Sequence, residues 1–319
     1  MGYDIGYKRK RNSISLFAWH EVSNFGDKLG PAMFYDIVKR PVCIEARRLS
    51  LVFGEGPART IYCFLGTFAH FLYGQHHFVL WGVGMGPPDG PAHHGCKPIE
   101  KGLDIDFRAL RGPLTREEMV KRGYNVPRNI PYGDPGLLIP YFYKPSIQKK
   151  GDYCLVPHHA HYNEWKARFP RERVIDTGID SYDNIQSLVT ELTSYDVILS
   201  GCLHATITAE AFGIPTSPLE PTLPFKFDDF YQSVNKKVEY IMSAPPNLDF
   251  STLAREVSSS WRPIEWEPKK WLATSPFIIN ADMNDLLSEH YSALRLGRTL
   301  IADREQYSLN HNYQDYPKP

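Results

Sequence analysis

The residues with the clearest chemical potential stand where a buried apolar run passes into a helical pattern, at Ser200-Gly201-Cys202-Leu203-His204. The letters VILSG predict a strand, and CLHATITAEAFG predicts the helix that follows it. The first N–H groups of a helix lack intrahelical partners and favour anions, and an imidazole beside them can donate a proton. His204 is therefore a candidate general acid. Taken alone, the pattern fits a structural histidine equally well.

A second candidate is Arg111, in the segment ALRGPLTREE. It precedes Gly112 and Pro113, which predicts a turn that projects its side chain just before a helix. A guanidinium binds carboxylate or phosphate through two parallel hydrogen bonds. The alternative is an ordinary surface arginine in a charged helix that also contains Arg108 and Arg116.

The segment SNFGDKLGP places Asn24 and Asp27 on either side of a glycine, after the first predicted strand. Both residue types bind sugar hydroxyls, and a carboxylate can also act as a base. They are as common in turns and helix caps. Asp134, in YGDPGLLIP, is interpreted as a turn residue with a structural role.

Histidines also cluster in PHHAH, at the end of a further predicted strand. We expect His158 and His159 to bind substrate. No acidic residue stands at ligand spacing from them or from His161, so no metal is expected.

The glycine-rich segment WGVGMGPP does not fit a nicotinamide-binding loop. Its Gly82, Gly84 and Gly86 do not form GxGxxG, and Pro87 and Pro88 disfavour a phosphate-binding helix start. We expect these glycines to let a loop approach the site closely.

The elements that must position these residues alternate between strand and helix. The predicted strands and helices are, in chain order, a strand at 14–19, a helix at 32–38, strands at 61–65 and 78–82, a helix at 106–123, strands in DYCLVPHH and RVIDTG, a helix at 184–193, and the strand-helix-strand unit VILSG, CLHATITAEAFG and IPTSPL. The polar stretch 141–152 is the predicted linker. We therefore expect an α/β fold with domains at 1–145 and 150–290, followed by a helix and loosely ordered tail at 291–319.

Composition limits the class of protein. The chain has 319 residues with 36 basic and 36 acidic side chains, so no global field favours nucleic acid. Five scattered cysteines without CxxC spacing, and a basic N-terminus without a signal-peptide core, predict a cytoplasmic protein. The most apolar stretch, 61–85, is interrupted by polar residues and glycines and falls short of a transmembrane helix.

Six motifs in order resemble those of the polysaccharide pyruvyl transferases: NFGDKLGP, WGVGMGP, RGPLTREEMVKRGY, YGDPGLLIP, VPHH and SGCLHATITAEAFGIP. The resemblance spans roughly residues 14–227. It implies two Rossmann-like domains facing a central cleft, as in GT-B glycosyltransferases, with phosphoenolpyruvate as the donor and no further cofactor. It implies that the acceptor is a hexose of a glycan or of a lipid-linked oligosaccharide, which receives a pyruvate ketal. Any association with the membrane would then be peripheral and would be made through that acceptor.

The resemblance also implies roles for individual residues. Arg111 and the Leu203-His204 pair correspond to donor-binding residues, and His204 to the general acid. Asn24 and Asp27 are expected to orient the acceptor on the side of the first domain.

One position departs from the family pattern, because Cys202 stands where an arginine is common. We expect Lys226, between two phenylalanines in LPFKFDDF, to supply the missing positive charge. The alternative is a surface lysine whose neighbours pack into the core. Two other functions remain open, a nucleotide-sugar glycosyltransferase on the same fold and a non-catalytic sugar-binding subunit of a polysaccharide synthesis complex.

Overall fold

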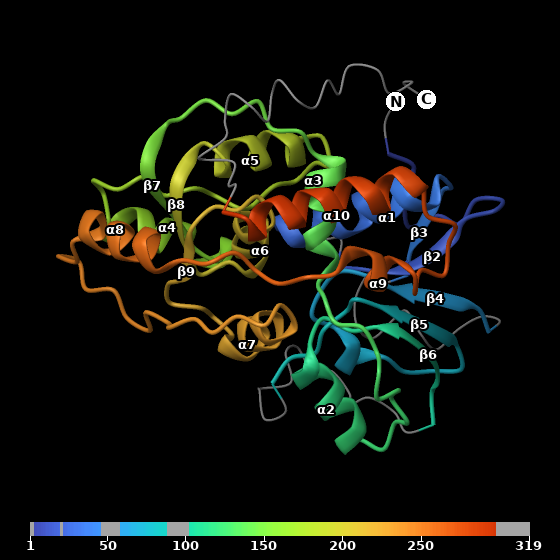
Figure 1. The fold of residues 1–319 in the computed structure, drawn as a ribbon. Coiled ribbons are helices and arrows are strands. Elements are labelled where there is room, and N and C mark those ends of the chain that lie inside the picture. The colour runs from blue at the N-terminus through green and yellow to red at the C-terminus, as the bar shows by residue number, and fades with distance from the viewer. Residues whose placement is uncertain (1–2, 20–21, 46–57, 88–101, 298–319) are drawn as a thin grey trace.

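The chain folds around two parallel sheets, and the computed structural model describes residues 3–19, 22–45, 58–87 and 102–297 (Figure 1). Within these residues the first sheet has the order β1-β3-β2-β4-β5-β6 and the second has the order β7-β8-β9. The strands are β1 (Ile5–Gly6), β2 (Ile14–Phe17), β3 (Val42–Ile44), β4 (Thr60–Cys63), β5 (His77–Trp81), β6 (Asp104–Ala109), β7 (Gly151–Val156), β8 (Tyr195–Ser200) and β9 (Thr216–Pro218). Adjacent strands are parallel in both sheets.

Helices connect and cover these strands. The α-helices are α1 (Phe25–Val38), α2 (Pro113–Lys121), α3 (Ile139–Phe142), α4 (Tyr162–Arg168), α5 (Asn184–Leu192), α6 (Leu203–Ala211), α7 (Pro224–Ser233), α8 (Phe250–Ser260), α9 (Pro268–Leu272) and α10 (Ala281–Arg295), and the 3-10 helices are η1 (Ala69–Phe71), η3 (Pro135–Leu138) and η4 (His159–His161). The α/β class with parallel sheets predicted from the sequence is confirmed. The facing-domain GT-B arrangement and the domain boundaries stay predictions.

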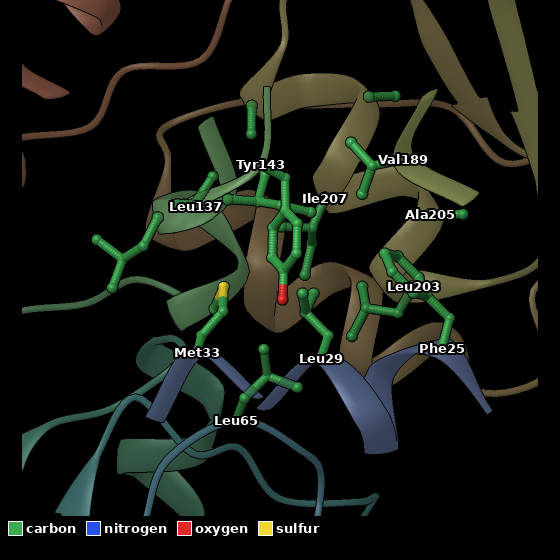
Figure 2. Packing of buried hydrophobic residues seen from close by; sticks show 14 of the residues in the cluster. Phe25, Leu29, Met33, Leu65, Leu137, Tyr143, Val189, Leu203, Ala205 and Ile207 are labelled. Atoms are coloured by element: carbon green, nitrogen blue, oxygen red, sulfur yellow. The ribbon is translucent and has the colours of Figure 1, made fainter. Parts of the chain in front are cut away.

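Helix α1 is buried between the two sheets. The Asn24 side chain caps its N-terminus by accepting a hydrogen bond from the Gly26 N–H at 2.8 Å. Figure 2 shows Phe25 and Leu29 of this helix packed toward Leu203 of α6. One hydrophobic cluster contains these side chains together with residues of β2 and β8, so apolar packing joins the two sheets.

The C-terminal helices return from the second sheet to the first half of the chain. Trp271 of α9 stacks on Trp81 of β5, with ring centroids 4.7 Å apart. The Tyr291 hydroxyl of α10 donates a hydrogen bond to the Leu137 carbonyl of η3 at 2.6 Å. Figure 1 shows α10 crossing between the two sheets beside α3. The tail expected beyond α10 lies outside the described residues.

Three predicted elements were wrong in part. Helix α1 begins at Phe25 rather than near residue 32, because its burial on several sides outweighs the unfavourable Gly30 and Pro31. Residues 104–109 form the edge strand β6 rather than the start of a helix. The segment RVIDTG makes only an isolated bridge through Val174, since Asp176 turns the chain by binding the Gly178 N–H.

Candidate active site

The turn between β8 and α6 is held by a buried serine. The Ser200 hydroxyl donates to the Val156 and Cys202 carbonyls, and it accepts from the Cys202 N–H at 3.0 Å. These bonds fix the backbone from which α6 starts. Among the described residues no side chain caps α6, so the first N–H groups of this helix have no side-chain partner there and can bind a ligand.

His204 lies in the first turn of α6 and faces the N-terminus of α1. A Cβ at Gly26 would stand 2.0 Å from its Nδ1, so only glycine leaves room for the ring there. On the other edge, Nε2 is enclosed, has no hydrogen-bond partner in the part of the chain that the structure describes, and lies 4.0 Å from the Asp134 Oδ2. Burial, and then the positive charges of Lys226 and Arg111, lower the pKa of His204 to about 3. The imidazole is therefore neutral at pH 7 in the ligand-free protein.

Lys226 lies in the first turn of α7 and is 9% exposed. Within the described part of the chain, no hydrogen bond or ion pair engages its ammonium, which stands 5.9 Å from the centroid of the Phe227 ring. Burial lowers the pKa of Lys226, an effect opposed first by the Cys202 thiol. The charge of Lys226 in turn lowers the pKa of His204 and of the histidines after β7. Among the described residues, Lys226 is therefore a cation without an ion-pair partner, and its charge acts on His204 and Asp27.

Arg111 does not project from its turn as the sequence predicted. Its side chain is fully buried, and its Nε donates to Asp229 Oδ2 at 3.0 Å. The two terminal nitrogens donate to the Thr67 hydroxyl and the Met85 carbonyl. Gly84, in the glycine-rich segment, packs against the guanidinium. The charge of Arg111 is thus anchored, yet it still lowers the pKa of His204.

The pair expected to orient an acceptor lies at the start of α1. Besides capping the helix, Asn24 contacts His159, with Nδ2 and Nδ1 2.9 Å apart. Asp27 is in the first turn, and burial raises its pKa from 3.8 to about 7, although Lys226 and Lys28 oppose the shift. Asp27 therefore exchanges a proton near neutral pH.

Two further predicted residues lie beside these groups. Burial, with the charge of Lys226, lowers the pKa of His158 to about 3 and also lowers that of His159. The Leu203 side chain belongs to the hydrophobic cluster and faces Phe25 (Figure 2). Any contact of Leu203 with a ligand must therefore use its backbone.

Sequence reasoning missed one member of the site, Asp134. Its carboxyl is fully buried, Oδ1 accepts from the Gly136 N–H at 2.8 Å, and Oδ2 faces His204. Burial raises the pKa of Asp134 to about 6, against the opposing charge of Arg111. The turn signal in YGDPG was correct, but only the packing of η3 against α6 brings this carboxyl to the imidazole.

We call Asp27, Arg111, Asp134, His204 and Lys226 the polar cluster. It brings two cations, two carboxyls and an imidazole together from segments far apart in sequence, with raised or lowered pKa values for four of the five. Such shifts are typical of sites that bind anions and move protons.

The described residues contain neither a metal site nor a membrane-spanning helix. No three His, Cys, Asp or Glu side chains there are arranged to hold a metal ion. No helix in those ranges has the length and apolar character needed to cross a bilayer.

Comparisons with known proteins point to one family. The family model for polysaccharide pyruvyl transferase matches residues 47–221, more than half of the chain. A solved structure of a functionally uncharacterised protein from Klebsiella pneumoniae subsp. pneumoniae NTUH-K2044 is 13% identical, with a TM-score of 0.43. That match covers 72% of this chain and 93% of the Klebsiella chain. The comparison with curated proteins gave no match.

Proposed function

Because the chain belongs to the polysaccharide pyruvyl transferase family, we propose that it moves the pyruvyl group of phosphoenolpyruvate onto a hexose. The product is a pyruvate ketal on a polysaccharide or its lipid-linked precursor, and phosphate is released. The observation that carries the proposal is Lys226, a buried ammonium without an ion-pair partner in the described residues, beside the start of α6 and His204. A buried cation of this kind is unfavourable alone and becomes favourable when an anion binds.

Phosphoenolpyruvate carries two anionic groups that match the cluster. Lys226 and the free N–H groups of α6 would bind one of them, the phosphate, through charge-assisted hydrogen bonds. Arg111 adds positive potential, although its own hydrogen bonds are taken up by Asp229, Thr67 and Met85. Lys226 thereby supplies the charge that Cys202 lacks.

Donor binding would also change the protonation of His204. Burial, and then the charges of Lys226 and Arg111, keep the imidazole neutral in the free protein, and an anion beside the two cations offsets their part of the effect. The pKa of His204 then rises, so the imidazole can take up a proton and act as the general acid.

The reaction balances with these groups alone. The imidazolium gives a proton to the methylene carbon of phosphoenolpyruvate, and the adjacent carbon becomes electrophilic. One sugar hydroxyl adds there and its proton returns to the imidazole. The bond from this carbon to the phosphate oxygen breaks, a second hydroxyl closes the ketal, and its proton leaves with the phosphate. Asp27 and Asn24 would orient the acceptor hydroxyls.

We place the protein in the cytoplasm, in peripheral contact with the inner face of the membrane when its acceptor is lipid-linked. The acceptor itself would make that contact.

The test is incubation with phosphoenolpyruvate and a panel of hexosides, following inorganic phosphate and the mass gain of a pyruvyl ketal. We expect both signals together, and a thermal shift with phosphoenolpyruvate alone, because a ligand that binds only the native state stabilises it. A thermal shift with nucleotide sugars but none with phosphoenolpyruvate would favour a glycosyltransferase. Glycan binding that is unchanged in His204→Ala, without turnover, would indicate a non-catalytic subunit.

A further inference from the structure

Two enclosed polar atoms face each other in the polar cluster without a partner. His204 Nε2 and Asp134 Oδ2 both lack hydrogen bonds in the described residues, and they are 4.0 Å apart. This distance is too long for a hydrogen bond, which needs about 2.7–3.2 Å. Buried polar atoms are rarely left without a hydrogen bond, so we expect the protein to have another state in which these two atoms form one.

The chain holds the carboxyl of Asp134 in a fixed place relative to α6. Its other oxygen, Oδ1, accepts from the Gly136 N–H at 2.8 Å. Gly136 packs on α6 so closely that a Cβ would stand 2.9 Å from Ile207 Cγ2, one turn beyond His204. Oδ2 therefore stays aimed at the imidazole while Oδ1 is occupied.

The charges around the pair decide when it closes. Burial, and then Lys226 on α7 and Arg111 before α2, disfavour a proton on His204. Burial raises the pKa of Asp134, and Asp229 on α7 adds to that rise, while Asp27 on α1 favours the charged form of Lys226. In the free protein burial and the two cations keep the imidazole neutral. An anion at Lys226 offsets the effect of the cations, and a hydrogen bond from the imidazolium N–H to the Asp134 carboxylate then compensates part of the cost of burying the charge.

We propose that Asp134 is a positioning residue that accepts the Nε2–H of His204 in the donor complex, so that Nδ1 carries the proton for transfer. The proposal rests on the proposed function. The proton moves from Nδ1 to the methylene carbon and leaves a neutral imidazole with its Nε2–H still bound to Asp134. Nδ1 then takes the proton of the attacking hydroxyl. Gly26 allows this arrangement, because its missing side chain leaves room for the Nδ1 edge of the ring at the start of α1, near Asn24 and Asp27.

The test is Asp134→Asn, which keeps the amide oxygen for Gly136 but removes the charge. Asp249→Asn is the matched control, because the Asp249 Oδ1 also accepts a backbone N–H, that of Thr252 at 3.0 Å, at the exposed start of α8. The titration of His204 is followed by NMR on histidine-labelled protein, and its signal is identified by its loss in His204→Gln. Spectra are recorded without ligand, with inorganic phosphate and with phosphoenolpyruvate.

We expect either ligand to raise the pKa of His204 in the native protein, and the rise to be smaller by one unit or more in Asp134→Asn. The kcat of that variant should fall ten-fold or more with a much smaller change in KM, and the alkaline limb of its kcat profile should move to lower pH. Asp134→Glu should recover part of the activity, and Asp249→Asn should behave as the native protein.

An unchanged His204 titration and a kcat within two-fold in Asp134→Asn would overturn the proposal, as would a native imidazole that stays neutral with phosphate. Failure of the proposed function has a different signature, since the native protein would then not turn over phosphoenolpyruvate. The phosphate titration would still decide whether Asp134 controls His204.

Discussion

Replacing Lys226 by methionine should move stability and donor binding in opposite directions. The ammonium is buried without an ion-pair partner among the described residues, so an apolar side chain of similar volume removes a desolvation cost. Replacing a buried ion pair by apolar side chains is neutral or stabilises a fold by about 1–4 kcal/mol, and for this single ammonium we expect about 1–2 kcal/mol. The same change removes a charge-assisted contact worth about 1.5–3 kcal/mol, which should weaken binding of phosphate or phosphoenolpyruvate ten- to hundred-fold.

Lys236→Met is the matched control for this experiment. The Lys236 side chain is 10% exposed, similar to Lys226, but its ammonium binds both carboxylate oxygens of Glu210, at 2.6 and 2.8 Å. Losing it leaves a fully buried carboxylate unpaired, which should lower the free energy of unfolding by about 3–5 kcal/mol. Urea unfolding measures stability, and the thermal shift as a function of phosphate concentration measures binding. Two results would contradict this expectation: a Lys226→Met variant that is destabilised as much as Lys236→Met, or a Lys226→Met variant that binds phosphate with native affinity.

Three further predictions concern other members of the polar cluster. Burial raises the pKa of Asp27 from 3.8 to about 7, so the native state holds its proton at pH values where the unfolded chain has lost it. The free energy of unfolding should therefore fall as pH rises from about 4 to about 7, by about 1.4 kcal/mol per pH unit and about 4 kcal/mol in all. Asp27→Asn should abolish that fall in urea unfolding at pH 5 and 8, and an identical pH dependence in both proteins would contradict the assignment. His204→Ala should lower kcat by about two to four orders of magnitude with little change in phosphate affinity, and turnover within a few-fold of native would exclude it as the acid. Arg111→Lys should lower the free energy of unfolding by about 2–3 kcal/mol, because an ammonium that binds Asp229 cannot also reach Thr67 and Met85. Native stability in thermal melts would show that the bonds to Thr67 and Met85 contribute little.

The sequence predicted the central strands well because their signal is local. The second half of β7, at 154–156, and most of β8 are apolar and bounded by turn residues, as expected for parallel strands buried on both faces. Strand β6 was misread because it lies at the edge of its sheet, where Asp104, Asp106 and Arg108 replace the apolar run. Its charges then resembled those of the exposed helix that follows.

The start of α1 was missed for a different reason. Gly26, Gly30 and Pro31 all disfavour a helix, and packing between the two sheets overrides that local preference. Gly26 itself is required by the approach of His204, which comes from a segment far away in sequence.

The polar cluster was predictable to the extent that its members stand at strand-to-helix turns. His204 and Asp27 were predicted from such turns, and Lys226 was predicted because Cys202 stands where the family often has an arginine. The burial of Arg111 and the approach of Asp134 to His204 depend on contacts between distant segments, which no local pattern contains. Asp134 and Asp229 carry ordinary turn and helix signals in the sequence.

The return of α10 to the first half of the chain constrains how a newly synthesised molecule can fold. Tyr291 and Leu137 are joined by a hydrogen bond across 154 positions, so the ribosome must make nearly all of the described chain before that contact can form. Contacts of such long range form slowly, and apolar surface that waits for them promotes aggregation. The first sheet therefore cannot complete its packing as an independent unit during translation. Its surface around η3 and α3 must be kept from other chains until α10 emerges.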